Sequence, residues 1–479
     1  MIKNNILSLF KKNFKYSPTK NQEKLIEELA NLIISFKSQD KDKKIFLLKG
    51  YAGTGKTTII SSFVKILNSL RIKTILLAPT GRAAKVLSFY AGKNAFTIHK
   101  KIYKQKSSKD GFGKFVLNKN LHSYTFFIVD ESSMISNSSN EATMFGSGRL
   151  LDDLIEYVYN DKNCMLIVVG DTAQLPPVGI DTSPALQPDV LEGYNLTVNE
   201  IELTEVIRQS FNSGILYNAT KVREQINEMP IDFYYPKIKL HGFNDIYKIS
   251  GEDLIEEISS SYDKYGIEQT IVVSRSNKRA NKYNQGIRNT ILYREEEISI
   301  GDYLMVVKNN YHWLDDNDKI DFIANGDIVE IIRIKNYQEK YGFRFADVSI
   351  RFIDYDIEID TKIMLSTLSI ETASLNNDQN KQLYYSVLED YSDIKSKKQQ
   401  YELVKKDPFF NALQVKFSYA ITCHKSQGGQ WKAVFVDQGY LNNDMLNVEY
   451  LRWLYTAITR STEKLYLVNF KKDFFEEDC

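Results

Sequence analysis

Apolar residues gather along this chain in short runs that end in Gly, Thr, Asp or Ser. The first half contains runs at 45–50, 74–80, 126–131 and 166–171, and the second half contains runs at 270–276, 415–422, 433–439 and 465–470. Such runs, separated by helical patterns, predict parallel strands that are buried on both faces. Because ligands bind at the carboxyl ends of such strands, the polar residues that close the runs should converge on one edge of each sheet. Two sets of runs predict two α/β domains.

Two stretches depart from this pattern. Residues 101–120 have a polar, glycine-containing centre between short alternating segments, which predicts a protruding β-hairpin. Residues 326–359 alternate between apolar and polar positions with turn residues at short intervals, which predicts a small antiparallel barrel or sheet. The charged stretch at 376–406 is expected to be helical and exposed.

Composition narrows the class of protein. The 479 residues carry a formal net charge of +1, and the three cysteines and five histidines are scattered, so neither a disulfide framework nor a zinc site is expected. The N-terminus lacks the apolar core of a secretory signal, and no apolar run approaches membrane-spanning length. We therefore expect a soluble, cytoplasmic protein without membrane contacts. A neutral total charge leaves room for nucleic acid, which needs only a local basic groove.

The stretch from Gly50 to Thr57 reads GYAGTGKT and fits the phosphate-binding loop pattern G-x-x-x-x-G-K-[ST]. Its glycines let backbone N–H groups turn toward phosphate oxygens, and the helix that follows adds a favourable dipole. Lys56 should reach the β- and γ-phosphates, and the Thr57 hydroxyl should ligate Mg²⁺. The alternative is a chance glycine turn, but a predicted strand and helix flank the loop as the motif requires.

Acidic residues close the run at 126–131. Asp130 can hold Mg²⁺ through water, and Glu131 can polarise the attacking water. The alternative is an acidic surface turn, which the buried strand before it makes less favoured. After the run at 166–171, Asp171 and Gln174 are expected near the γ-phosphate, because a neutral amide can both donate and accept.

Two arginines are candidates for stabilising the transferring phosphate. Arg208 lies in LTEVIRQS and Arg460 in LYTAITRS. Phosphoryl transfer spreads charge over the γ-oxygens, which a guanidinium group stabilises. The alternative for each arginine is an ordinary surface salt bridge.

The order of these motifs resembles that of superfamily 1B DNA helicases, in the branch of RecD-like and phage Dda-like enzymes. The resemblance covers nearly the whole chain and rests on the blocks GYAGTGKTT, LLAPTGRAAKVLS, FTIHK, FFIVDESSM, VVGDTAQLPPVG, LTEVIRQS, YAITCHKSQGGQW and LYTAITRSTEKLYLV. It implies an α/β fold of two RecA-like P-loop domains, with a β-hairpin pin inserted in the first and a small SH3-like β-barrel in the second. The implied boundaries are 1–205 for the first domain, 206–330 and 413–479 for the second, and 331–412 for the inserted barrel with its helical extension.

The resemblance also assigns nucleotide contacts by position. ATP with Mg²⁺ is the implied cofactor, and Gln22 matches the glutamine that reads adenine. Gly428 matches a loop that touches both nucleotide and DNA. The remaining nucleotide and catalytic positions are Gly53, Thr54, Gly55, Lys56, Thr57, Thr58, Asp130, Glu131, Gln174, Arg208 and Arg460.

A track for single-stranded DNA is implied in the same way, along Pro79, Thr80, His99, Asn277, Lys278, Thr422, His424 and Lys425. Small donors, backbone turns and lysines suit phosphate contacts without base reading. The alternative for His99 and His424 is a satisfied structural histidine. Phe112 and Phe115 in the predicted pin could stack on the terminal base pair, or they could simply pack the hairpin.

These expectations add up to an ATP-dependent helicase that moves along single-stranded DNA and unwinds duplex DNA at junctions. The resemblance implies 5′ to 3′ movement, a monomer, and a bacterial or phage-infected cell. Two alternatives stay open at the level of the sequence: an RNA helicase of the Upf-like kind, which uses the same two-domain engine, and an ATP-switched nucleic-acid clamp that does not unwind.

Overall fold

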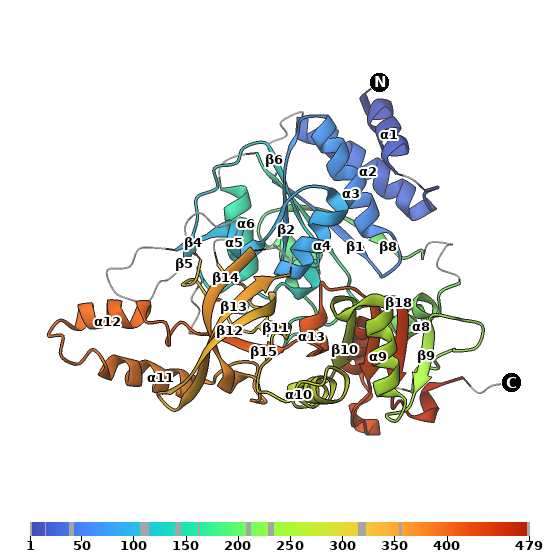
Figure 1. Cartoon of the computed structure of the whole chain (residues 1–479). Coiled ribbons are helices and arrows are strands. Elements are labelled where there is room, and N and C mark those ends of the chain that lie inside the picture. Colours follow the sequence, from blue (N-terminus) through green and yellow to red (C-terminus); the bar gives the residue numbers. More distant parts are fainter. Residues whose placement is uncertain are drawn as a thin grey trace.

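The computed structural model describes residues 2–14, 16–37, 43–105, 115–138, 145–160, 163–206, 212–228, 234–314, 322–353 and 357–476 (Figure 1). Two parallel sheets and a closed barrel form its framework. None of the helices in these ranges combines the length and the apolar composition that crossing a lipid bilayer requires.

The first sheet has six strands in the order β3-β2-β6-β7-β1-β8, all parallel. The four apolar runs of the first half form strands in it, as predicted. Its strands are β1 (Lys44–Gly50), β2 (Lys73–Ala78), β3 (Ala95–Thr97), β6 (Thr125–Val129), β7 (Met165–Gly170) and β8 (Thr197–Leu203). Because β6 and β7 are buried along their whole length, the polar residues that follow them lie at the sheet's carboxyl edge.

Helices cover both faces of this sheet. One face packs on α1 (Ile2–Asn13), α2 (Lys20–Lys37), α3 (Lys56–Ser69) and α4 (Gly81–Ala91). In α2 the buried residues Leu25, Leu29 and Ile33 recur at helical spacing, so they face the sheet. The other face packs on α5 (Ile98–Ile102), α6 (Leu150–Tyr159) and α7 (Pro188–Glu192), with the short 3₁₀ turns Ser132–Met134 and Pro184–Leu186 beside them.

A two-stranded antiparallel ribbon projects from the first sheet. It pairs β4 (Tyr103–Gln105) with β5 (Phe115–Leu117), within the range where the sequence predicts a hairpin. Residues 106–114, which include Phe112 and the predicted tip, lie outside the described residues.

The second sheet has five parallel strands in the order β16-β10-β17-β18-β9. They are β9 (Ile246–Ile249), β10 (Thr270–Ser274), β16 (Ala420–Thr422), β17 (Trp431–Asp437) and β18 (Ser461–Val468). One face packs on α8 (Gly214–Glu228) and α14 (Val448–Ile458), and the other on α9 (Leu254–Tyr265) and α10 (Asn277–Gly286), which continues into a π-helical turn (Ile287–Ile291). The short helix α13 (Cys423–Ser426) follows β16, and 3₁₀ turns cover Ile267–Gln269, Asn443–Met445 and Lys472–Phe474.

Five strands close into the barrel, in the order β11-β12-β13-β14-β15. They are β11 (Tyr303–Val306), β12 (Ile328–Lys340), β13 (Phe343–Phe352), β14 (Ile357–Met364) and β15 (Leu413–Phe417), and a 3₁₀ turn (Leu365–Thr367) follows β14. The predicted alternation at 326–359 is thus confirmed as part of a small barrel. Two of its strands, β11 and β15, lie outside the range 331–412 that the sequence assigns to the insertion, because closing the barrel requires strands from both flanks.

The run at 415–422 differs from its prediction as a single parallel strand. The structure divides it between β15 of the barrel and β16 of the second sheet. The chain changes partners at Tyr419, whose buried hydroxyl donates to Asp302 Oδ1 at 2.9 Å and accepts from the Tyr303 N–H at 3.1 Å. That tertiary contact, which no local pattern encodes, ends the strand.

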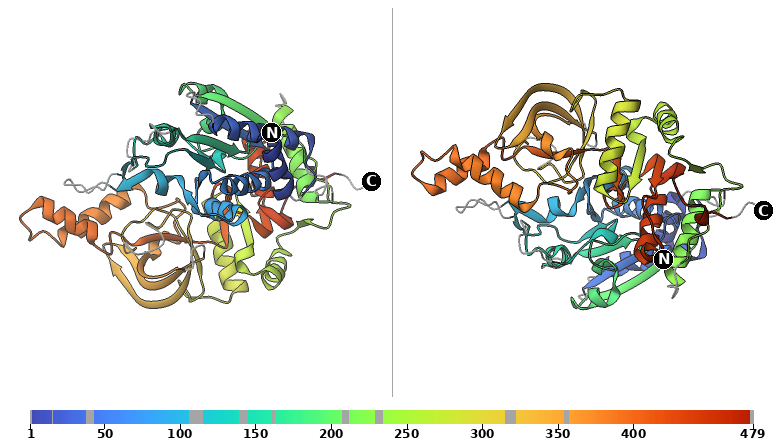
Figure 2. Two further views of the ribbon diagram at one scale, coloured as in Figure 1. Left: turned by 90° about the horizontal axis from the view of Figure 1, so that it is seen from above. Right: turned by 90° about the horizontal axis from the view of Figure 1, so that it is seen from below.

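The charged stretch at 376–406 is helical, as predicted. It forms α11 (Asn377–Glu389) and α12 (Lys397–Lys406), which pack on the barrel through a small core that includes Leu383, Val387 and Val404. The barrel and these helices project to one side of the two sheets, away from both chain termini (Figure 2).

Candidate nucleotide and nucleic-acid sites

The predicted phosphate-binding loop joins β1 to α3. Gly53 and Gly55 have φ angles of 76° and 84°, which L-residues with a side chain rarely adopt, so the two glycines give the loop its shape. Lys56 Nζ donates to the Tyr51 carbonyl at 2.8 Å, and the Thr54 hydroxyl donates to the same oxygen at 2.8 Å. The lysine is thus held at the loop, where a phosphate oxygen can replace a backbone carbonyl. Thr57 and Thr58 lie half-buried in the first turn of α3.

Gln22 lies against this loop. It is 2% exposed in α2, its amide nitrogen donates to the Thr54 carbonyl at 2.8 Å, and its amide oxygen accepts from the Thr19 N–H at 3.0 Å. The predicted adenine reader therefore touches the phosphate loop directly. This contact fixes the side chain at the loop's rim.

Asp130 and Glu131 follow β6 on the same edge. Burial and, after it, the charge of Glu131 raise the pKa of Asp130 to about 6, while the Glu131 N–H bond and the nearby charge of Lys56 oppose the rise. Asp130 Oδ1 accepts from the Glu131 N–H at 2.9 Å. Glu131 has a φ of 53°, a left-handed conformation that costs a non-glycine residue roughly 1–3 kcal/mol and is characteristic of functional sites.

Asp171 and Gln174 follow β7, the strand between β6 and β1. Asp171 is 1% exposed and accepts from the Ala173 N–H at 3.0 Å. The Gln174 side-chain oxygen is buried and has no hydrogen-bond partner among the described residues. Since buried polar atoms are nearly always hydrogen-bonded, this acceptor is poised for a group that the protein itself does not supply.

The second sheet meets this edge through α14 and the segment after α13. The Tyr455 hydroxyl bonds to the Ala52 N–H and to Asp171, each at 2.8 Å. The Thr456 hydroxyl accepts from the Leu175 N–H at 2.9 Å. The Gln427 amide donates to the Leu175 carbonyl at 2.7 Å. The nucleotide edge of the first sheet is therefore lined by side chains of the second.

Arg460 ends the LYTAITR block just after α14. It is 3% exposed, and its guanidinium donates to the carbonyls of Thr456 at 3.0 Å and Gly429 at 3.2 Å. The surface salt bridge considered for this arginine is therefore not what the structure shows. Arg208 lies outside the described residues.

Gly428 packs against the start of α4. Its φ is 73°, and a Cβ added there would lie 2.6 Å from the Ala83 Cβ and 3.2 Å from the Thr80 hydroxyl. Next to it, the Arg82 guanidinium stacks on the Trp431 ring at 3.9 Å. The predicted loop of the second sheet and the predicted DNA turn of the first are thus in direct contact.

The predicted DNA residues of the first sheet are placed unequally. Pro79 and Thr80 are half-buried, and the Thr80 hydroxyl caps α4 by accepting from the Ala83 N–H at 3.2 Å. His99 packs its ring 5.0 Å from that of Phe145, and burial lowers its pKa to about 4, against the raising effect of Asp153. The structural alternative for His99 therefore has direct support.

The predicted DNA residues of the second sheet lie after β10 and β16. Asn277 and Lys278 begin α10, and Lys278 forms an exposed ion pair with Glu371 at 3.0 Å. Thr422 precedes α13, which carries His424 and Lys425. Lys425 Nζ is buried without a hydrogen-bond partner among the described residues, and burial together with the charge of Lys416 lowers its pKa to about 8. A buried cation of this kind suits a phosphate ligand.

Phe115 does not sit where a wedge would. It is 9% exposed and packs at 4.8 Å from the Phe145 ring and 4.3 Å from the Tyr311 ring of the segment after β11. A ring buried between two aromatic side chains has no free face for a base pair. The structure thus favours the alternative that Phe115 packs the base of the hairpin.

The sequence analysis assigned no individual role to several residues that make contacts between the two sheets. They include Arg82, Gln427, Tyr455 and Thr456. All lie inside the quoted motif blocks. Tyr455 and Thr456 stand in an apolar helix whose spacing predicts core residues, so their polar contacts follow only from the packing of the two sheets.

Two family models match parts of this chain that contain the sites described above. A family model described as an AAA domain matches residues 37–245, and one described as a UvrD-like helicase C-terminal domain matches residues 417–468. An uncharacterised protein of Acanthamoeba polyphaga mimivirus is 28% identical, covering 91% of this chain and 97% of its own length.

Two relatives that are named as helicases match smaller parts of this chain. The ATP-dependent RecD2 DNA helicase of Deinococcus radiodurans is 29% identical over 42% of this chain and 24% of its own length. The ATP-dependent DNA helicase Dda of phage T4 is 26% identical over 56% of this chain and 57% of its own length. A Pif1 helicase from Bacteroides, solved with ADP-AlF₃ and single-stranded DNA, aligns over 97% of this chain and 95% of its own at 16% identity and a TM-score of 0.47.

Proposed function

We propose that this chain, which belongs to superfamily 1B of the DNA helicases and hydrolyses ATP, moves 5′ to 3′ along single-stranded DNA and separates duplex DNA ahead of it. One observation carries the proposal: the second sheet contacts the first in two places, where the Tyr455 hydroxyl of α14 accepts from the Ala52 N–H of the phosphate loop and where Gly428 packs against Thr80 and Ala83 at the start of α4. A nucleotide at the phosphate loop is in a position to change how the two sheets pack. Alternating grip on a strand then converts ATP turnover into stepping.

The residues at the phosphate loop and after β6 and β7 take the roles that the sequence suggests. Lys56 neutralises the β- and γ-phosphates, and Glu131 accepts the proton of the attacking water. Gln174 lies near the γ-phosphate, where its unpartnered amide oxygen accepts from the attacking water and its amide nitrogen donates to a phosphate oxygen. Arg208 and Arg460 stabilise the transferring group, one from each side of the nucleotide. Gln22 reads the base.

Mg²⁺ fits Thr57 and Asp130. Asp130 Oδ1 accepts one backbone N–H, and its other carboxylate oxygen has no partner among the described residues, so it is able to take an aqua ligand of the ion. In the described part of the chain, no three or more His, Cys, Asp and Glu side chains cluster in a way that could hold a metal. When bound, the ion supplies charge neutralisation at the phosphates.

The DNA track runs along Thr80, Asn277, Thr422 and Lys425, between the two sheets and the barrel. Two named relatives act on DNA, which favours DNA over the RNA alternative for this chain. The β4–β5 ribbon is proposed as the pin, and the five-stranded barrel as the SH3-like insertion of the family. The domain boundaries, the monomeric state and the cytoplasmic location stay predictions.

The proposal is tested by strand displacement with ATP. A duplex with a 5′ single-stranded tail should be unwound, and the same duplex with a 3′ tail should not. Glu131→Gln, which preserves nucleotide binding, is the matched control for ATP-driven action. Unwinding of the 3′-tailed duplex alone would contradict the direction. DNA-stimulated ATPase without any displacement would favour the clamp, and stimulation by RNA but not DNA would favour the RNA helicase.

The pin is tested separately by removing residues 111–113. This deletion should spare DNA-stimulated ATP hydrolysis and weaken strand separation, because the hairpin acts only at the junction. If both activities fall together, or neither changes, the pin assignment is wrong.

A further inference from the structure

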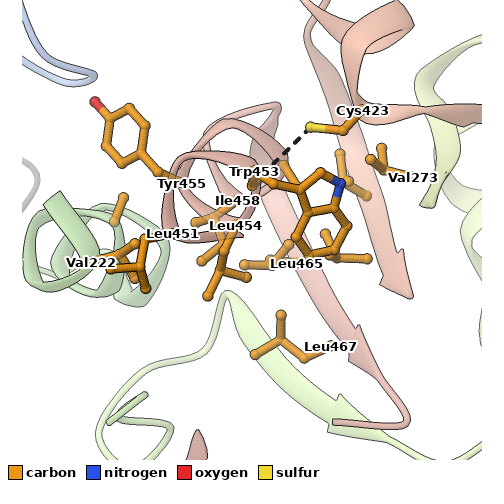
Figure 3. Close-up of a cluster of buried hydrophobic side chains, with 14 of the residues drawn as sticks. Val222, Val273, Cys423, Leu451, Trp453, Leu454, Tyr455, Ile458, Leu465 and Leu467 are labelled. Carbon is orange, nitrogen blue, oxygen red and sulfur yellow. Dashed lines mark hydrogen bonds between the residues drawn. The ribbon is translucent and has the colours of Figure 1, made fainter. Parts of the chain in front are cut away.

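The hydroxyl group of Tyr455 makes two hydrogen bonds that cross from the second sheet to the first. The residue is 1% exposed; its ring packs with the α14 core, and its hydroxyl points out of that apolar cluster (Figure 3). It bonds to the Ala52 N–H of the phosphate loop at 2.8 Å and to Asp171 Oδ2 at 2.8 Å. A single side chain of the second sheet thus contacts two separate parts of the nucleotide edge.

The directions of these bonds are fixed by chemistry. A backbone N–H only donates and a carboxylate only accepts, so the hydroxyl must accept from Ala52 and donate to Asp171. Burial and the charge of Asp171 raise the pKa of Tyr455 well above its usual value, so the donated proton stays on the phenol. Both bonds are therefore present together, and the hydroxyl cannot rotate without breaking one.

Asp171 depends on this contact. Its carboxylate is buried, with Oδ1 bonded to the Ala173 N–H and Oδ2 to the tyrosine hydroxyl. Losing the hydroxyl would leave a buried carboxylate oxygen without a donor, which proteins avoid. The hydroxyl of the next residue, Thr456, accepts from the Leu175 N–H. These bonds together hold this turn of α14 in one position against the first sheet.

We infer that Tyr455 is a positioning residue for ATP hydrolysis: its hydroxyl sets α14 against the phosphate loop and thereby sets where Arg460 stands relative to the phosphates. Arg460 follows five residues later, and its guanidinium is tied to the Thr456 carbonyl within the same turn. The inference rests on the proposed ATP cycle. The rival reading is that Tyr455 is only a core residue.

Tyr455→Phe removes one oxygen and keeps the ring packing. We expect the kcat of DNA-stimulated ATP hydrolysis to fall about tenfold, or about 1.4 kcal/mol of activation free energy, with KM for ATP within about twofold of the parent. Tyr450→Phe is the matched control, because that tyrosine is buried in the same helix and the groups near its hydroxyl, Gln438, Arg275 and Tyr235, lie outside the first sheet. It should leave kcat unchanged.

A double-mutant cycle with Asp171→Ala tests the route of the effect. If the hydroxyl acts through Asp171, Tyr455→Phe should reduce kcat much less in the Asp171→Ala background than in the parent. Equal effects in both backgrounds, or a lower melting temperature with unchanged kcat in the folded protein, would overturn the inference. Absence of DNA-stimulated ATPase in the parent protein would instead contradict the proposed function, so the two failures are distinguishable.

A second, independent observation concerns the first sheet, beside which lie two neighbouring hollows of about 280 and 320 Å³. Among the residues that the structure describes, their lining includes basic groups and no carboxylate. We define the basic strip as Lys37, Arg71, Lys73, Lys101, Lys119 and His122. His122 lines one hollow and the next residue, Ser123, lines the other, so the two hollows adjoin. Burial and the charges of Lys101 and Lys73 lower the pKa of His122. With a net charge of only +1 over the chain, this one-signed strip is a local feature.

The strip begins at the ribbon. Lys101 stands two residues before β4, and Lys119 two residues after β5. In one hollow, Lys101 Nζ lies 5.4 Å from the centre of the Phe96 ring. The cationic side chains of the two hollows, Lys37, Arg71, Lys73, Lys101 and Lys119, suit contacts with a phosphodiester backbone. We propose that the basic strip binds the backbone of the duplex arm ahead of the ribbon, a proposal that rests on the helicase function.

The test compares two triple variants of equal charge change. Lys73, Lys101 and Lys119 are replaced by Gln in one, and the exposed Lys11, Lys12 and Lys24 of α1 and α2 in the other. Binding of a blunt 20-base-pair duplex is measured without nucleotide at several salt concentrations. The strip variant should bind the duplex about tenfold more weakly, with a salt slope smaller by roughly 0.9 per lost phosphate contact.

Binding of single-stranded DNA and its stimulation of ATPase should be unchanged in both variants. Equal loss in the control variant, no loss in the strip variant, or no duplex binding by the parent protein would each overturn this proposal. Duplex binding through the strip by a protein that lacks DNA-stimulated ATPase would contradict the helicase function and leave the strip assignment standing.

Discussion

The two sheets bring different kinds of groups to their contact. The first sheet offers the backbone of the phosphate loop, a lysine and the acids that follow its strands, with Lys56 and Asp130 close enough for the lysine to affect the acid's pKa. The second sheet offers side chains that are almost fully buried, namely Tyr455, Thr456 and Arg460, already bonded to backbone groups. A site built this way can bind nucleotide with one half and complete its chemistry only when the other half packs correctly.

Substitution of Arg460 should give the largest effect on the contribution of the second sheet. Arg460→Ala should lower kcat about 10³–10⁵-fold with little change in nucleotide affinity, as expected for a contact made in the transition state. It should also lower the melting temperature, because the buried carbonyls of Thr456 and Gly429 lose their donor. Arg460→Lys should rescue poorly, since an ammonium lacks the planar fork. Steady-state kinetics and a thermal melt on one preparation check this; normal kcat with a lowered melt would refute the arginine finger.

Substitution of Glu131 tests the contribution of the first sheet to ATP hydrolysis. Glu131→Gln should keep ATP binding and reduce hydrolysis about 10²–10⁴-fold, because the amide cannot accept the water's proton. Glu200→Gln is the control, since Glu200 pairs with Lys49 on the neighbouring strand at 2.7 Å and has no role in the proposed chemistry. Nucleotide binding and single-turnover hydrolysis are measured together. A normal hydrolysis rate in Glu131→Gln would show that another group activates the water.

Gly428 tests the contact between the halves directly. Gly428→Ala should push its loop away from α4, because the added methyl would meet Ala83 at 2.6 Å in a backbone conformation that alanine disfavours. Misplacement of this size costs up to ~10²-fold in rate, and the loss should appear mainly in DNA-stimulated turnover. Gly286→Ala is the control, because nothing lies within 4 Å of its added methyl and its helical φ suits alanine. Equal ATPase rates in both variants would contradict the coupling role.

Substitution of Phe115 should give the smallest effect, and it tests whether this residue packs the ribbon or acts as a wedge. As a packed residue, Phe115→Leu should lower the free energy of unfolding by about 1 kcal/mol and leave unwinding per folded molecule intact. A wedge would give the reverse, with weaker unwinding and an unchanged melt. Denaturant unfolding and strand displacement on the same protein separate the two.

Local sequence patterns were enough to predict most strands of the two sheets, the phosphate loop and its acids. Each depends on a local rule: short apolar runs form buried parallel strands, and glycines at fixed spacing turn a loop toward phosphate. Because the strands are parallel, their polar ends had to meet at one edge, so the positions of Lys56, Asp130 and Gln174 followed from their order. The alternation at 326–359 likewise required a small antiparallel unit.

The contacts between these elements follow only from the tertiary structure. Barrel closure needed β11 and β15 from outside the alternating stretch, and the Tyr419–Asp302 contact divided one apolar run between two sheets. Phe115, which the pattern leaves free to serve as a wedge, is buried because the segment after β11 folds back on the ribbon. Tyr455 reads as core from its helical spacing, yet its hydroxyl reaches Ala52, some 400 positions earlier in the chain. Local patterns encode burial and turn, whereas the partner of a polar atom is set by which surfaces pack together.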